Sequence, residues 1–201
     1  MSIVKGEEWG SAGVVPDDLV IAHSDDAATK FVTAARRTNG PIPPMTLTGG
    51  DLSRTLGGGR ALTPGMDATE LAVDLGAALL DGKLHWFVAH LAARQSWLRG
   101  RIVIAANGAF LGSWNIAPRA HPGDGKLDIV DADPSLRDRL AARRRLASGT
   151  HVPHPDITIR RREAMQIEFD QPTPIRLDGR PVGRVRTVSV RTEPAALRIW
   201  V

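Results

Sequence analysis

The sequence predicts an α/β fragment followed by an antiparallel all-β region. Two short apolar strands alternate with two helices within the first 56 residues, which is the pattern of a β-α-β-α unit. From residue 70 onward the pattern changes to many strands separated by turns such as Asp81-Gly82. A loop rich in glycine and proline, residues 57–67, lies between the two patterns. We therefore predict two units, residues 1–66 and residues 67–201.

The α/β fragment begins with an apolar strand, DLVIAH, at residues 18–23. Residues 25–37 carry apolar side chains at helical spacing and are predicted to form a helix. A second short strand at residues 45–47 leads into a short helix at residues 51–56, which Asp51 caps. A right-handed crossover makes the two strands parallel, so both strand-to-helix loops open at the carboxyl edge, where such sheets bind ligands.

The all-β region contains ten predicted strands and one helix. The strands are predicted at residues 70–75, 77–80, 84–91, 101–106, 127–130, 156–160, 165–169, 173–177, 182–190 and 197–201. The helix is predicted at residues 134–148, because Asp133 suits its cap, Pro134 its first position and Gly149 the position after its end. Its leucines at 136, 140 and 146 form one apolar stripe.

Composition excludes several classes of protein. A chain of 201 residues with 42% hydrophobic content is expected to be globular. No run approaches the roughly 18 apolar residues of a membrane helix, and residues 1–10 lack the apolar stretch of a secretory signal. We therefore expect a cytoplasmic protein, which would be peripheral to the membrane if it binds lipid. The absence of cysteine excludes disulfides and thiolate metal sites. No zinc site is expected from His121, His151 and His154 either, because no helix fixes their spacing.

Charge is distributed unevenly along the chain. Residues 1–134 contain 12 basic and 15 acidic side chains, whereas residues 135–201 contain 14 and 7, so the second part carries +7. Two arginine runs, residues 143–145 and 160–162, dominate this excess and suit contacts with phosphate or carboxylate groups. The alternative is an ordinary solvated surface. Nucleic-acid binding is disfavoured, because the two runs are not interleaved with aromatic residues.

Four segments, in the right order, resemble the diacylglycerol-kinase-like lipid kinases. Residues 45–57 line up with the family segment P-L-G-T-x-N-D-F-A-R-T-L-G, and residues 106–128 resemble G-x-x-x-A-P-x-A-x-x-x-D-G-x-L-D. Gly149-Thr150-His151 precedes the terminal strands as it does in the family, and Asp178-Gly179-Arg180 lies at the family's D-G-E turn. The resemblance covers most of the chain from residue 18. It implies a partial nucleotide-binding α/β domain packed on an antiparallel β-sandwich.

The resemblance also implies ATP and Mg²⁺ as cofactors and a lipid hydroxyl as the phosphate acceptor. Four residues are implied near the phosphates: Ser24, Thr48, Gly49 and Gly50. Three residues resemble the family's magnesium and phosphate network: Asp25, Asp51 and Asp124. Asp25 is the one remaining candidate for the catalytic proton acceptor. Each acid also has an ordinary local explanation, as a helix cap for the first two and as a turn residue for Asp124.

Three features depart from the family pattern. The phosphate-cradling loop G-G-D-G-T corresponds to residues 23–27 (HSDDA). Side chains there occupy the space in which backbone amides would approach a phosphate. Asp26 also adds a negative charge beside the phosphate position. Arg180 replaces the glutamate that takes the lipid proton, and a guanidinium is not a base near neutral pH. Finally, only about 17 residues precede the first strand, so we expect the opening strands of the family's nucleotide domain to be absent.

We therefore expect a shortened relative of the lipid kinases that is catalytically weak or inactive. The alternative is a non-enzymatic binding or scaffold protein, in which the β-sandwich and the basic end engage an anionic lipid headgroup at a membrane surface, a protein, or a second copy of the chain. Trp86, Trp97, Trp114 and Trp200 are interpreted as core anchors between the sheets. Exposed apolar surface around a cleft would instead favour lipid contacts.

Overall fold

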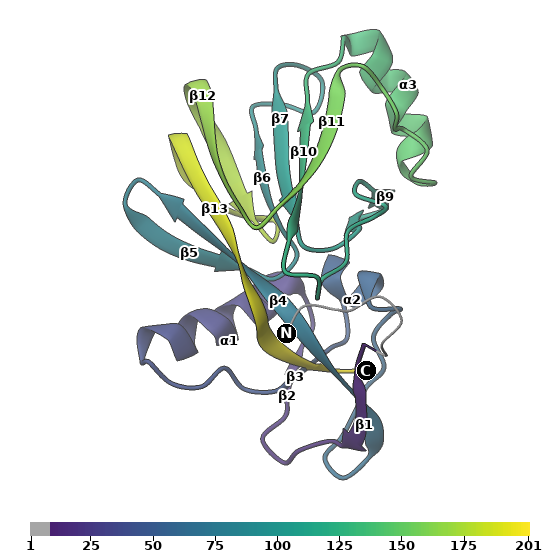
Figure 1. The fold of residues 1–201 in the computed structure, drawn as a ribbon, viewed down its shortest axis with the longest axis vertical. Coiled ribbons are helices and arrows are strands. Elements are labelled where there is room, and N and C mark those ends of the chain that lie inside the picture. Colours follow the sequence, from purple (N-terminus) through teal and green to yellow (C-terminus); the bar gives the residue numbers. More distant parts are fainter. Residues whose placement is uncertain (1–8) are drawn as a thin grey trace.

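The computed structural model describes residues 9–201, so most of residues 1–10, where we expect no secretory signal, lies outside the described part. Figure 1 shows strands that run through the whole molecule, with α1 against the lower part and α3 at the opposite end. The elements are β1 (Ser11–Val14), β2 (Val20–Ala22), α1 (Asp25–Arg37), β3 (Met45–Leu47), α2 (Asp51–Thr55), β4 (Asp67–Leu80), β5 (Lys83–Phe87), β6 (His90–Arg94), β7 (Ile102–Ala106), β8 (Phe110–Leu111), β9 (Trp114–Asn115), β10 (Leu127–Ala132), α3 (Leu136–Leu146), β11 (Ile157–Arg162), β12 (Ala164–Leu177) and β13 (Arg180–Trp200). None of these helices combines the length and the hydropathy needed to cross a membrane.

Most strands belong to one sheet, organised around the long antiparallel pair β4 and β13. The order across the sheet is β1-β4-β13-β12-β6-β7-β10-β11, and β5 pairs with β4. The predicted parallel pairing of the first two α/β strands is confirmed, since Val20 of β2 lies opposite Met45 of β3. In addition, β3 pairs parallel with β13, where Ile199 lies opposite Met45. The α/β fragment and the all-β region therefore share one sheet.

Two main cores hold this arrangement together. The first lies inside the sandwich and contains large side chains from strands far apart in the sequence, among them Phe87, Leu91, Leu127, Ile167 and Ile175. The second lies against α1 and α2 and combines their apolar side chains with those of β4 and β13, among them Val32, Leu52, Leu75, Leu197 and Ile199. Because the second core crosses residue 66, it joins the two predicted units; the division at that residue stays a prediction.

Helix α1 forms where the sequence predicts it, because both ends carry suitable groups. Ser24 precedes the helix in an extended conformation and accepts a hydrogen bond from the Ala27 backbone N–H at 3.1 Å. Acidic residues occupy the first turn and basic residues the last turn, as the helix dipole favours. Ala28 and Val32, four residues apart, are fully buried against the sheet.

Several strand boundaries differ from those predicted. Residues 70–75 and 77–80 form one strand, β4, because Gly76 continues the pairing and lies against the Phe87 ring. The predicted strand at 84–91 is divided into β5 and β6, since the backbone N–H groups of Val88 and Ala89 bond to a side chain instead of a neighbouring strand. Strand β1 and the hairpin β8–β9 were not predicted, since both are short.

Helix α3 lies within the predicted range, but Ser135 caps it and not the predicted Asp133. Its leucine stripe is not a packed face either, since only Leu146 packs against the outer cluster. Leu136 and Leu140 are 56% and 50% exposed. The buried residue of this helix is Arg139, whose guanidinium donates to the carbonyls of Pro134 at 2.7 Å and Gly100 at 2.6 Å and pairs with Asp133. A charged group that meets several carbonyl oxygens thus anchors the first turn of α3, where the sequence pattern suggested leucine.

Candidate functional site

The loops that follow β2 and β3 lie side by side, as the parallel pairing predicts. The His23 ring hydrogen-bonds the Thr48 hydroxyl at 2.7 Å, which links the two loops directly. Gly49 is also close to the first loop, because a Cβ atom built on it would lie 2.7 Å from the His23 carbonyl oxygen. The structure therefore brings Ser24, Thr48, Gly49 and Gly50 into one region at the carboxyl edge of these strands.

Asp25 connects these two loops through its carboxylate. Its two oxygens accept hydrogen bonds from the backbone N–H groups of Asp51, at 2.6 Å, and Leu52, at 3.1 Å. The predicted cap of α2 by Asp51 is wrong, because Asp51 is the first residue inside the helix. The N-cap residue is Gly50, which has no side chain, so Asp25 supplies the cap from another helix. Burial, followed by the nearby Asp178 charge, raises the pKa of Asp25 to about 7, although the two N–H donors oppose this shift.

Asp178, the first residue of the turn that resembles the family's D-G-E, is a second buried hub. Its carboxylate accepts hydrogen bonds from the backbone N–H groups of Val88, Ala89 and His90 at 2.9–3.0 Å, and from the Thr29 hydroxyl at 2.6 Å. These bonds connect α1, the break between β5 and β6, and the turn between β12 and β13. The turn is therefore fixed rigidly against the α/β part.

Arg180, two residues further on, faces the loop that carries Asp26. The Arg180 Nε atom lies 3.0 Å from an oxygen of Asp26, and Lys30 Nζ lies 2.7 Å from the other oxygen. Both groups are partly exposed, so the pair is solvent-screened and contributes little to stability. The two substitutions that depart most from the family pattern are thus in contact with one another.

The three acids implied as metal ligands each have other partners. Asp51 accepts a hydrogen bond from the Gly112 backbone N–H at 2.7 Å. Asp124 forms an ion pair with Arg161 and accepts a bond from the Lys126 backbone N–H. Within residues 9–201, the group of three ligating side chains that meets within 4.8 Å is Asp138, His154 and Asp156. The side chains of Asp25, Asp51 and Asp124 therefore do not fit a shared Mg²⁺ ion as they lie.

Two buried polar residues of this region escaped the sequence analysis. His90 lies 3.6 Å from the Asp51 carboxylate, and its Nδ1 atom has no hydrogen-bond partner. Asn107 donates from its amide to the carbonyls of Asp74 and Val88. His90 lies within the strand predicted at residues 84–91 and Asn107 within the family-like segment at residues 106–128, and no local pattern marks a polar residue whose partners are distant in the sequence.

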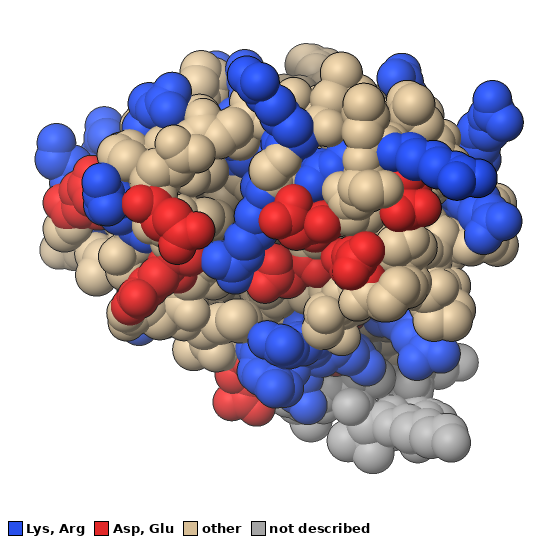
Figure 2. Space-filling view, turned by 90° about the horizontal axis from the view of Figure 1, so that it is seen from above, with Lys and Arg blue, Asp and Glu red and all other residues tan. Residues whose placement is uncertain are grey.

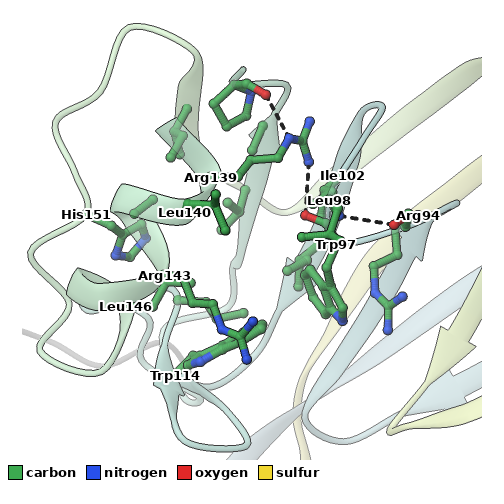
Figure 3. Close-up of a pocket in the computed structure, with 18 of the residues that line it drawn as sticks. Arg94, Trp97, Leu98, Ile102, Trp114, Arg139, Leu140, Arg143, Leu146 and His151 are labelled. Carbon is green, nitrogen blue, oxygen red and sulfur yellow. Dashed lines mark hydrogen bonds between the residues drawn. The ribbon is translucent and has the colours of Figure 1, made fainter. Parts of the chain in front are cut away.

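A second candidate site lies on the outer face of β7 and β10. Strand β7 is buried on both faces: Val103 and Ala105 enter the sandwich core, while Ile102 and Ile104 join an outer cluster with Trp97 and Trp114. Helix α3 covers this face incompletely and leaves a cavity of about 520 Å³. In Figure 3, Leu140 and Leu146 of α3 border it on one side and Trp97 and Ile102 on the other.

Polar groups at this cavity are few and specific. The Arg94 guanidinium stacks 3.9 Å from the centre of the Trp97 ring, and Arg143 of α3 also lines the cavity. His151 lines it too; this ring is 5% exposed, and its Nδ1 atom has no hydrogen-bond partner. Burial lowers the pKa of His151, which favours the neutral ring. The cavity therefore offers apolar walls and guanidinium groups.

The interpretation of the tryptophans as core anchors is correct for Trp200 but not for Trp97 and Trp114. Trp200 is buried, whereas Trp97 and Trp114 meet edge to face at 5.1 Å as partly buried walls of the cavity. Their position favours contact with an apolar ligand, the alternative set out for exposed apolar surface around a cleft.

The architecture is that of the two-part kinases in which an α/β nucleotide domain adjoins an antiparallel β-sandwich. Residues 80–201 match the family described as YegS C-terminal NAD kinase beta sandwich-like domain, so this chain belongs to that family. The resemblance to diacylglycerol-kinase-like lipid kinases is thereby confirmed. No curated protein matches the sequence.

Solved structures show the same fold. Two structures described as a "putative diacylglycerol kinase from Bacillus anthracis str. Sterne" give TM-scores of 0.63 and 0.61 at 16% sequence identity, and each match covers 90% of this chain and 77% of the other. A structure of a diacylglycerol kinase from the same strain gives 0.58 at 17% identity, with 90% and 75% covered. At these identities the likeness establishes the fold.

Proposed function

We propose that this chain is a lipid-kinase relative that binds an amphiphilic lipid and transfers phosphate weakly or not at all. The observation that supports weak or absent phosphate transfer is the ion pair between Asp26 and Arg180. In the family pattern these positions hold a glycine of the phosphate loop and the glutamate base. Here the Asp26 carboxylate pairs with the Arg180 guanidinium, so neither position is suited to its family role.

The remaining candidate base is poorly placed for proton transfer. Both oxygens of Asp25 already accept backbone hydrogen bonds at the start of α2. A carboxylate that accepts a proton from a lipid hydroxyl would lose one of these bonds, and the buried N–H left unpaired would oppose the transfer. Asp25 is thus better suited to hold α2 than to act on a substrate.

The same geometry argues against ATP and Mg²⁺ in the family's manner. The first N–H groups of α2 would be a natural position for a phosphate, but the Asp25 carboxylate already occupies them. Asp25, Asp51 and Asp124 do not lie within reach of one ion, so they do not form a shared Mg²⁺ site.

The cavity beside α3 supports the lipid-binding part of the proposal. Its volume of about 520 Å³ lies within the range of small-molecule sites, and its walls are mainly aliphatic and aromatic. An acyl chain would bury against Ile104 and Trp114, and an anionic headgroup would meet Arg94 or Arg143.

Thermal denaturation with two sets of ligands tests both parts. We expect a short-chain phosphatidic acid, used below its aggregation limit, to raise the melting temperature, and millimolar ATP with Mg²⁺ to leave it unchanged. In Ala142→Phe, which fills the cavity from α3, the lipid effect should disappear, while it should persist in Ala141→Phe on the outer side of the same helix. Absence of stabilisation by the lipid would overturn the lipid-binding part.

Kinase activity is tested by restoring the family's residues at positions 26 and 180. The double variant Asp26→Gly with Arg180→Glu restores both family residues, and Arg180→Glu alone places two carboxylates where the ion pair was. We expect phosphorylation of a diacylglycerol to be recovered in the double variant and not in Arg180→Glu alone. A parent protein that is stabilised by ATP with Mg²⁺ and phosphorylates diacylglycerol at a normal rate would overturn the proposal of weak activity.

Association of two copies of the chain remains a separate prediction. The edge strand β11 pairs with β10 on one side, and its other edge is available for pairing within the described part of the chain. Analytical ultracentrifugation would test this prediction.

A further inference from the structure

Exposed leucines gather around the mouth of the cavity beside α3. Leu136 and Leu140 lie four residues apart on the same side of α3, and they border a shallow depression with Arg137 and Arg144. Leu98, in the turn between β6 and β7, is 53% exposed. Leu98 and Leu140 both line the cavity, so this second element brings its leucine to the same opening. Single exposed leucines need no explanation, but two at one opening, with a third one turn away on the same helix, form an apolar patch.

The helix that carries this patch is strongly basic. Residues 136–146 contain five arginines and one aspartate, a net charge of +4. Arg139 is used inside the protein, whereas Arg137, Arg143, Arg144 and Arg145 are exposed. In Figure 2, which looks down on the end where α3 lies, basic side chains are prominent at the right, the side on which Figure 1 places this helix. Acidic side chains gather toward the middle of the view.

Helix α3 has little apolar packing of its own. Its buried anchor is Arg139, which ties the first turn to carbonyls and to Asp133, whereas Leu136 and Leu140 are half exposed and Leu146 packs only partly against the outer cluster. A helix with leucines and arginines exposed together is typical of segments that lie in the interface of an anionic bilayer. There, leucine side chains enter the acyl boundary and arginines contact phosphate groups.

We infer that α3 and the β6–β7 turn form a docking surface for an anionic phospholipid bilayer. Leu98, Leu136 and Leu140 insert at the interface, and the exposed arginines of α3 contact the headgroups. Because Leu98 and Leu140 also line the cavity, docking would place its opening against the membrane. This consequence rests on the proposed lipid-binding function, whereas the bilayer contact itself does not depend on it.

Vesicle sedimentation with matched variants tests the inference. The full chain should sediment with vesicles of phosphatidylcholine and phosphatidylglycerol and only weakly with phosphatidylcholine alone. Leu136→Ser with Leu140→Ser should weaken binding at least tenfold, roughly what the loss of two inserted leucines predicts. Arg137→Gln with Arg144→Gln should weaken it by about fivefold per arginine and reduce its salt dependence.

Control variants make equal changes elsewhere. Leu79→Ser with Leu84→Ser alters two leucines that are 45% and 43% exposed on β4 and β5, and Arg37→Gln with Lys83→Gln removes two exposed charges near α1. Both controls should bind vesicles like the parent. Ala142→Phe should also keep vesicle binding while it loses the monomeric lipid, so the two proposals can fail independently.

Two results would overturn the inference. One is that the full chain does not bind anionic vesicles, or that the control and α3 variants lose vesicle binding equally. The other is that a single-stranded oligonucleotide binds in a way that depends on the α3 arginines, while vesicle binding does not depend on the leucines. That pattern would assign the basic helix to nucleic acid.

Discussion

Replacing Asp178 with alanine removes a buried carboxylate on which four hydrogen bonds converge. Three of the donors are the consecutive backbone N–H groups of Val88, Ala89 and His90, and the fourth is the Thr29 hydroxyl. Val88 and Ala89 lie in the break between β5 and β6, where no neighbouring strand binds their N–H groups. The substitution would therefore leave several buried donors unpaired and loosen the contact between the turn at residues 178–180 and α1.

The expected cost follows from the number of donors. Each buried polar group left unpaired costs about 1–3 kcal/mol, and water that enters the vacated space would recover part of the total. We expect a loss of about 3–5 kcal/mol in the free energy of unfolding, a large share of the 5–15 kcal/mol typical of a native protein. For a chain of this length the melting temperature should fall by roughly 6–20 °C.

Urea denaturation followed by tryptophan fluorescence measures this loss, and Asp81→Ala is the matched control. Asp81 and Asp178 both begin Asp-Gly turns and both have positive φ values, 47° and 48°. The strain of placing alanine at positive φ is therefore common to both variants and cancels in the comparison. Asp81 is exposed, so its variant should lose only about 1 kcal/mol. If both variants lost the same free energy, the hydrogen-bond argument would be refuted.

Three further predictions concern the rest of the structure. Gly50→Ala should cost at least about 2 kcal/mol more than Gly57→Ala, because both positions have φ near 100° but only at Gly50 would the new methyl group meet Asp25. Burial raises the pKa of Asp25 to about 7, so the folded state binds this proton more tightly than the unfolded state does. The stability gained from this proton is complete below about pH 4 and is lost as the pH rises to 7. The free energy of unfolding should therefore fall by up to about 1.4 kcal/mol per pH unit between about pH 4 and pH 7, and less steeply in Asp25→Asn. Arg139→Met should release α3 and speed tryptic cleavage within it about tenfold, whereas Arg137→Met, on the outer side, should not; equal rates would contradict the anchoring role of Arg139.

Local signals were sufficient for the elements whose ends carry their own partners. The range of α1 follows from Ser24 at its start and from the spacing of Ala28 and Val32, all of which lie within a few residues of one another. The parallel strands β2 and β3 follow from the handedness of the crossover between them. The family follows from short motifs in a fixed order, and the match over residues 80–201 confirms it.

Contacts between distant residues decided the site. The interpretation of Asp25 as the cap of α1 is wrong: Ser24 caps that helix, and the Asp25 carboxylate reaches Asp51 across the parallel strands and caps α2. Arg180 and Asp26 are 154 residues apart, so the sequence shows two independent substitutions where the structure shows one ion pair. The division of residues 84–91 has the same origin, since Asp178 takes the N–H groups that a neighbouring strand would otherwise bind.

The sequence by itself thus determined the helices, the parallel pair and the kinship, because these depend on neighbours in the chain and on motifs that can be read directly. Only the tertiary structure decided that α3 turns Leu136 and Leu140 outward and anchors itself through Arg139. The periodicity of a helix defines which residues share a side, but not whether that side meets a core. Here carbonyl groups from the β6–β7 turn meet the helix at Arg139, which leaves Leu136 and Leu140 half exposed and a cavity beneath the helix.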